Sequence, residues 1–134
     1  MIKLNQVFTN SKEIMKCFGI ANGEEKTICS TAKDHWVHLL KMNGSNNGIV
    51  NKHGPENTAW DFISINNENG SLNIGQYPPL HAMFVQELNE TDYTFKGVYE
   101  LDTANSTEHS IIFKHIANEV DSHAYEWLIV DTVS

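Results

Sequence analysis

One stretch of the chain, 93–101, alternates between apolar and polar side chains and strongly restricts the possible folds. Tyr93, Phe95, Tyr99 and Leu101 recur at every second position, with polar residues between them. A period of two over this length is typical of a β-strand with one buried face. Gly97 interrupts the pattern, which predicts a bulge, a bend or the close approach of another backbone.

Other short runs rich in branched and aromatic residues predict further strands. They are His35–Leu40, Ala59–Ile65, His81–Leu88, His109–Ile116 and Tyr125–Val130. Clusters of Asn and Gly at 43–48 and 66–70 predict turns between them, because both residues tolerate positive φ.

One helix is predicted near the N-terminus. Asn10 and Glu13 form a capping-box pattern, Val7 or Phe8 precedes it as a hydrophobic staple, and Gly19 or Gly23 ends the helix. The expected fold is mainly β (α+β), a small curved antiparallel sheet or partly closed barrel with one short N-terminal helix. We expect a single domain over residues 1–134, because this length can bury a core without disulfides.

The expected compartment is the cytoplasm. The sequence has no apolar run long enough to cross a membrane, and its first residues lack a basic segment followed by a long apolar run. Cys17 and Cys29 are therefore expected to be buried reduced thiols rather than a disulfide.

Recognisable catalytic motifs are missing from the sequence. It holds no glycine-rich phosphate motif, no nucleophile elbow and no carboxylate pair placed for acid–base work. His35 and His38 are the only closely spaced histidines, and on a strand this spacing puts them on opposite faces, where they cannot share a metal ion. We therefore expect a non-enzymatic protein with no cofactor and no metal.

Aromatic side chains are the most informative remaining feature. Trp36 lies close to Asp34, and Trp60 directly precedes Asp61. Aromatic rings beside a carboxylate can stack on a flat heterocycle while the carboxylate accepts from its N–H groups. The candidate ligand-binding residues are Trp36, Trp60, Asp61, Tyr77 and Tyr93, and the expected ligand is a nucleobase or nucleotide-like molecule. The alternative is that these rings fill the core of a small barrel.

The charge balance points to a different possible partner. The net charge is −8, and all nine basic residues are Lys, so the guanidinium groups that grip phosphates are missing. Lys33, Lys41 and Lys52 lie near the candidate tryptophans in the sequence and are candidates for a local basic rim. The alternative function is a small acidic inhibitor or immunity-type protein that binds a basic protein partner.

The second half of the chain resembles a known family. Phe84-Val85-Gln86-Glu87, an acidic turn, the strand 93–101 and then Ile112–Ala117 resemble the paired strands of small PUA-like barrels of the SRA and EVE type, which are restriction-associated. The resemblance implies a barrel whose pocket accepts a flipped or modified base, in nucleic acid, in the setting of bacterial or phage defence. By position along the chain, Trp36, Trp60 and Asp61 would line that pocket.

Overall fold

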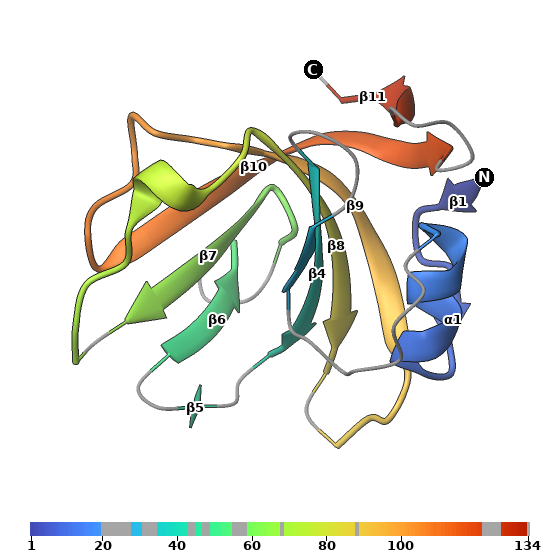
Figure 1. The fold of residues 1–134 in the computed structure, drawn as a ribbon, viewed down its shortest axis with the longest axis horizontal. Helices are drawn as coiled ribbons and strands as arrows, with labels where there is room; N and C mark the ends of the chain where they lie inside the picture. Colours follow the sequence, from blue (N-terminus) through green and yellow to red (C-terminus); the bar gives the residue numbers. More distant parts are fainter. Residues whose placement is uncertain are drawn as a thin grey trace.

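The computed structural model describes residues 1–19, 28–30, 35–42, 45–46, 49–54, 59–67, 69–87, 89–121 and 127–133, with the backbone alone for 28–30 and 45–46. Within these ranges the protein is mainly β, with one short α-helix, as the sequence predicts (Figure 1). No helix in the described ranges is long and apolar enough to cross a membrane.

The strands form one curved sheet. Its order is β3 (Ile28–Ser30), β4 (His35–Lys41), β8 (Leu80–Gln86), β9 (Tyr93–Leu101), β10 (Ser110–Asp121), β7 (Phe62–Asn67), β6 (Ile49–His53) and β5 (Ser45–Asn46). Three short strands lie off this path: β1 (Ile2–Lys3) and β11 (Leu128–Thr132) pair with β10, and β2 (Val7–Phe8) pairs with β9. Neighbouring strands are antiparallel, except that β4 and β8 run parallel.

The sheet curves but does not close along its path. Strands β4 and β6, each second from an end of the sheet, approach each other where Met42, just after β4, bridges Asn51 of β6. The Asn51 side-chain amide donates to the Lys41 carbonyl oxygen at 3.2 Å. In Figure 1, the strands β6 and β7 of the sheet lie at the left and α1 at the right, with β4, β8 and β9 between them. The expected fold class, a small curved β sheet with one helix, is therefore confirmed.

Two apolar clusters stabilise the fold. The first lies beneath the helix α1 (Ser11–Cys17) and includes Ile14, Met15, Phe84 and Phe95. The second lies between β4, β7, β8, β9 and β10 and includes Ile63, Met83, Val85, Tyr99 and Phe113. Strand β8 is buried on both faces, because Phe84 belongs to the first cluster and its neighbours Met83 and Val85 to the second.

The helix begins as predicted. The Asn10 side chain accepts from the Glu13 backbone N–H at 3.0 Å, and the Glu13 carboxylate accepts from the Thr9 hydroxyl at 2.7 Å. Ile14 and Met15 then face the sheet and are buried. The N-terminal cap thus fixes where the helix starts, and its apolar face fixes where it docks.

The structure of β9 differs in one detail from the alternation predicted for residues 93–101. The sequence places Tyr93, Phe95, Tyr99 and Leu101 on one face, but the structure puts Phe95 in the first cluster and Tyr99 in the second. The physical reason is a bulge: the pairing with β8 shifts its register between Met83 and Phe84, opposite Gly97. The extra residue of a bulge moves the following side chains to the other face.

Several short elements were not predicted, or lie elsewhere than expected. The strand expected at 59–65 is β7 and begins at Phe62, while β6 was not predicted at all. The turn expected at 43–48 lies partly outside the described residues. Cys17 is a half-buried thiol, but the side chain of Cys29 is not described, so the expectation of two buried thiols stays a prediction.

Candidate aromatic and histidine site

Two of the residues expected to bind a ligand, Trp36 and Tyr77, lie together. Trp36 is the second residue of β4, and Tyr77 follows the short 3-10 helix η2 (Ile74–Gln76) that leads into β8. Their ring centroids are 5.3 Å apart, and both side chains are half-buried. The parallel pairing of β4 with β8 creates this contact, because it brings the start of β4 beside the segment that enters β8.

A pair of buried histidines lies next to these rings. His38 of β4 and His81 of β8 are both fully buried, and Nε2 of His38 lies 2.7 Å from Nδ1 of His81. Phe113 of β10 packs against both imidazoles, with ring centroids 5.6 Å from His38 and 4.6 Å from His81. Trp36, His38, Tyr77, His81 and Phe113 are hereafter called the aromatic–histidine cluster.

The hydrogen bonds of the pair define the tautomer of each ring. Nε2 of His81 contacts the Pro78 carbonyl oxygen, which can only accept, so this nitrogen carries the proton. Nδ1 of His81 is then the acceptor, and Nε2–H of His38 donates to it. Nδ1 of His38 remains as an acceptor, and it is buried with no hydrogen-bond partner in the described structure.

Both imidazoles are neutral at pH 7. Burial lowers the pKa of His81 to about 4, the hydrogen bond to Pro78 opposes this shift, and the nearby His35 adds to it. Burial, and then the neighbouring His81, hold the pKa of His38 well below its usual value. The cluster therefore combines two half-buried aromatic rings, Trp36 and Tyr77, with a buried and neutral hydrogen-bond acceptor on His38.

His35 and His38 behave as the strand spacing predicts. The His35 ring packs against Trp127, 4.7 Å away, whereas His38 faces His81. Among the described residues, no three metal-ligating side chains converge. The sequence analysis missed the His38–His81 pair, because the two residues are 43 positions apart and only the parallel pairing of β4 and β8 brings them together.

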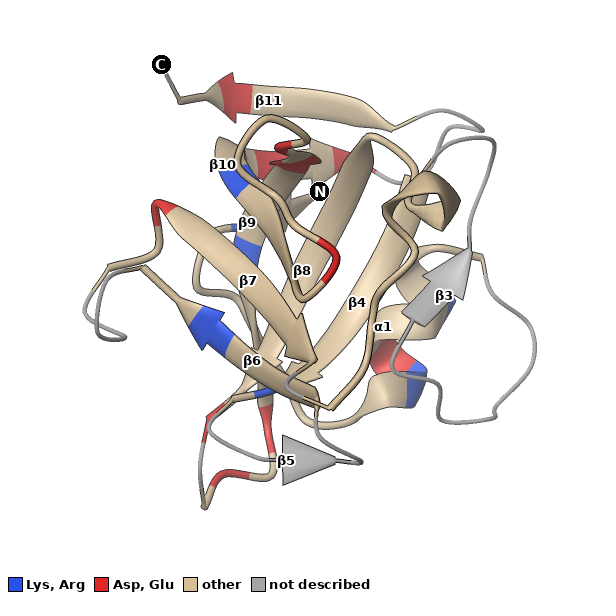
Figure 2. Ribbon diagram, turned by 90° about the vertical axis from the view of Figure 1, so that its left-hand side faces the viewer, with Lys and Arg blue, Asp and Glu red and all other residues tan. Residues whose placement is uncertain are grey.

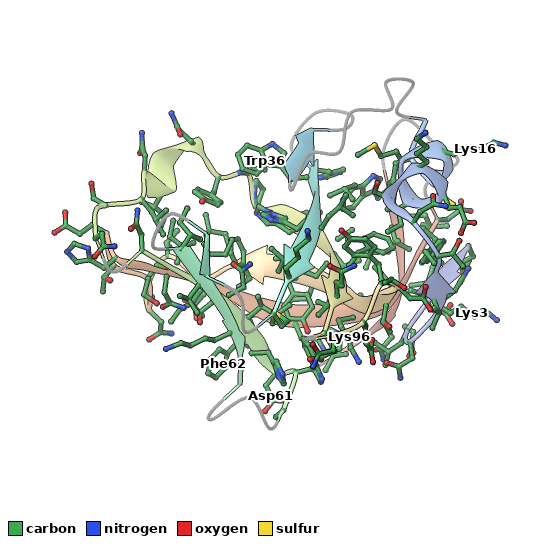
Figure 3. All side chains as sticks on the ribbon, turned by 90° about the horizontal axis from the view of Figure 1, so that it is seen from below. Lys3, Lys16, Trp36, Asp61, Phe62 and Lys96 are labelled. Atoms are coloured by element: carbon green, nitrogen blue, oxygen red, sulfur yellow. The ribbon has the colours of Figure 1, made fainter. Side chains whose placement is uncertain are left out.

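Trp60 and Asp61 lie away from the cluster. Figure 3 places Trp36 and Asp61 on opposite sides of the molecule. The Trp60 ring stacks on His53 at a centroid distance of 3.6 Å, and Lys96 Nζ lies 4.6 Å from its centroid. These two groups already contact the indole ring. The Asp61 side chain is exposed, and its backbone carbonyl accepts from the His115 N–H at 3.0 Å.

Tyr93 belongs to the core. It is 8% exposed, it lies in the apolar cluster beneath α1, and its backbone pairs with Phe8 of β2. The alternative stated from the sequence, a ring that fills the interior, describes this residue.

The structure describes two of the three lysines expected to form a basic rim, Lys41 and Lys52. Lys33 lies outside the described residues. Lys41 is the last residue of β4 and lies about 16 Å along the strand from Trp36, at ~3.3 Å per residue. It lies next to the bridge between Met42 and Asn51, the residue that precedes Lys52 in β6. Figure 2 shows the described Lys and acidic residues spread over several elements.

The comparisons with known proteins bear on the fold. No family model matches the chain, and no curated protein matches it in sequence. One similar solved structure is described as the 5-hydroxymethylcytosine-specific restriction enzyme AbaSI, with a TM-score of 0.69 and 18% identity over 87% of this chain. The chain matches 40% of the length of that protein. At this identity the match shows the fold alone.

This match corrects one expectation and supports another. The expectation of a non-enzymatic protein is wrong, because the matching solved structure is a restriction enzyme. The absence of a recognisable catalytic motif was therefore not a valid reason to exclude an enzyme. The resemblance carried by residues 83–117 is confirmed in its coarser form: the chain has a fold distantly similar to that of a restriction-associated protein.

Proposed function

We propose that this chain binds a nucleobase in nucleic acid through the aromatic–histidine cluster, as the base-recognition part of a restriction-type enzyme with a PUA/SRA-like fold. The observation that carries the proposal is the meeting of Trp36 and Tyr77 beside a buried histidine acceptor. The fold match to a restriction enzyme described as specific for 5-hydroxymethylcytosine supports a modified base as the ligand.

The physical argument concerns how a base could be held. A base inside a duplex is stacked on its neighbours, so recognition of its edge requires that it leave the stack. An aromatic side chain that replaces this stacking contributes about 1–3 kcal/mol per base. Trp36 and Tyr77 are the half-buried members of the cluster, so their rings are the ones that a base could reach first.

The charge of the chain makes this local contact important. With a net charge of −8 and no Arg, contacts to the phosphate backbone contribute less than in a basic reader. A larger share of the binding affinity must then come from contacts with the base itself. We assign no stacking role to Trp60, because His53 and Lys96 already contact its ring.

The experiment compares binding to a short duplex with one 5-hydroxymethylcytosine and to the same duplex with cytosine. Trp36→Ala is expected to weaken binding of the modified duplex about tenfold or more, measured by calorimetry, because it removes a stacking ring. Trp60→Ala is the matched control, since it removes another half-buried indole outside the cluster, and it should bind as the wild type does. Circular dichroism confirms that both variants fold.

Two results would contradict the proposal. One is a folded Trp36→Ala variant that binds the modified duplex as tightly as the wild type. The other is a wild-type protein that binds neither duplex, which would favour the alternative of a basic protein partner.

A further inference from the structure

The starting observation is a buried polar atom that nothing satisfies. His38 has no exposed surface, and its Nδ1 has no hydrogen-bond partner in the described structure. Most buried polar atoms in proteins are paired, and an unpaired one is a candidate position for a ligand or an ordered water. The rings nearest to this histidine include Trp36, His81 and Phe113.

The polarity of this atom is determined by a chain of hydrogen bonds. The Pro78 carbonyl oxygen requires a proton on Nε2 of His81, which leaves Nδ1 of His81 to accept from His38. His38 therefore carries its proton on Nε2, and its Nδ1 can only accept. His81 therefore acts as a positioning residue, because its hydrogen bonds select the tautomer of His38.

We infer that His38 determines the specificity of the aromatic–histidine cluster, and that it selects bases with an exocyclic amino group over bases with a carbonyl at that position. The inference rests on the proposed function. An amino group donates to Nδ1, whereas a carbonyl oxygen would face the same lone pair with no proton between them. Sites built around a buried hydrogen-bonding group discriminate strongly against ligands that leave it unpaired.

The neighbouring rings define how a base would approach. Trp36 lies on the same face of β4 as His38, with ring centroids 6.1 Å apart, and its ring also contacts those of His81 and the half-buried Tyr77. Because the structure encloses His38, binding of a base to Nδ1 would require the half-buried rings of Trp36 and Tyr77 to move apart. The stacking contacts of Trp36 and Tyr77 and the acceptor of His38 would then act on the same base.

The test uses the full chain and two duplexes that differ only at the target base. One carries 5-hydroxymethylcytosine and the other carries 5-hydroxymethyluracil, so the amino group at C4 is replaced by a carbonyl while the hydroxymethyl group is kept. The wild type is expected to bind the first duplex at least tenfold more tightly. His38→Phe keeps a ring of similar size but removes the acceptor, so the two affinities should become equal within about threefold.

A second measurement does not depend on a variant that folds. The ¹⁵N chemical shift of His38 Nδ1 in the wild type is expected to move when the 5-hydroxymethylcytosine duplex binds, because the nitrogen then accepts a hydrogen bond. The 5-hydroxymethyluracil duplex, added until the protein is equally saturated, should leave this signal unchanged.

The possible failures are distinguishable. If neither duplex binds, the proposed function itself is wrong. If both bind equally, if the uracil duplex binds more tightly, or if a folded His38→Phe keeps the preference, this inference is wrong and the proposed function stands. An Nδ1 signal that does not change with the cytosine duplex would also overturn the inference.

Discussion

Gly97 occupies a position that no other residue can take without strain. Its φ is +111°, and a Cβ placed there would lie 2.5 Å from His115 Nε2 and 2.6 Å from the Ala117 carbonyl oxygen. The His115 ring stacks on Tyr99, 5.0 Å away, and the Tyr99 hydroxyl donates to the Trp60 carbonyl oxygen at 2.8 Å. Because Gly97 has no side chain, β10 can approach β9 closely enough for His115 to stack on Tyr99.

Gly97→Ala is expected to lower the free energy of unfolding by about 3 kcal/mol, since it combines a strained φ with a steric clash. Urea denaturation measures the change. Gly19→Ala is the matched control: its φ is +70°, but a Cβ there meets nothing within 4 Å, so the loss should be about 1 kcal/mol. Equal losses in the two variants would show that the close approach of β10 is unimportant.

At the scale of single elements, the helix α1 depends on its first turn. It is seven residues long, which is too short to be stable in isolation. The Asn10 side chain satisfies the Glu13 N–H, and Ile14 and Met15 pack on the sheet. The N-terminal cap and the apolar face that packs on the sheet therefore both contribute to the stability of this short helix.

Asn10→Ala should destabilise the protein by about 1 kcal/mol, because one N–H of the first turn loses its acceptor. Asn10→Ser keeps an acceptor at the cap and should change stability by only a few tenths of that amount. Both values come from urea denaturation followed by circular dichroism. A loss of the same size in both variants would argue against capping as the cause.

At the scale of the whole molecule, the parallel pair β4–β8 lies within the sheet and brings the buried His38 and His81 together. Burial depresses the pKa of both imidazoles in the folded protein, to about 4 for His81, below the ordinary value of 6.5. Between these two pH values the unfolded chain binds protons that the folded chain does not. Stability present above pH 6.5 is therefore lost as the pH falls toward 4.

Acidification from pH 7 to pH 4 is thus expected to remove roughly 3 kcal/mol of stability through His81 alone, at 1.36 kcal/mol per pKa unit. Urea denaturation over this range measures it. The double variant His38→Phe/His81→Phe replaces both partners by apolar rings and should lose less stability on acidification than the wild type. An unchanged pH dependence in that variant would assign the acid sensitivity to other groups.

Local sequence patterns alone determined much of the architecture. The capping box located the start of α1, the alternation over 93–101 located β9, and Gly97 marked its bulge. Each of these features depends on side chains only a few residues apart along the chain, so it can be read from the sequence. The same reasoning correctly separated His35 from His38, because the two-residue period of a strand is local.

The candidate site, in contrast, depends on the tertiary structure. Only strand pairing brings Trp36, Tyr77 and the His38–His81 pair together. The same packing buries Tyr93 in the core and stacks His53 on Trp60. Aromatic residues were candidates for either role because core and binding site use the same side chains. Which rings stay partly exposed depends on long-range contacts between strands, and these contacts have no period in the sequence.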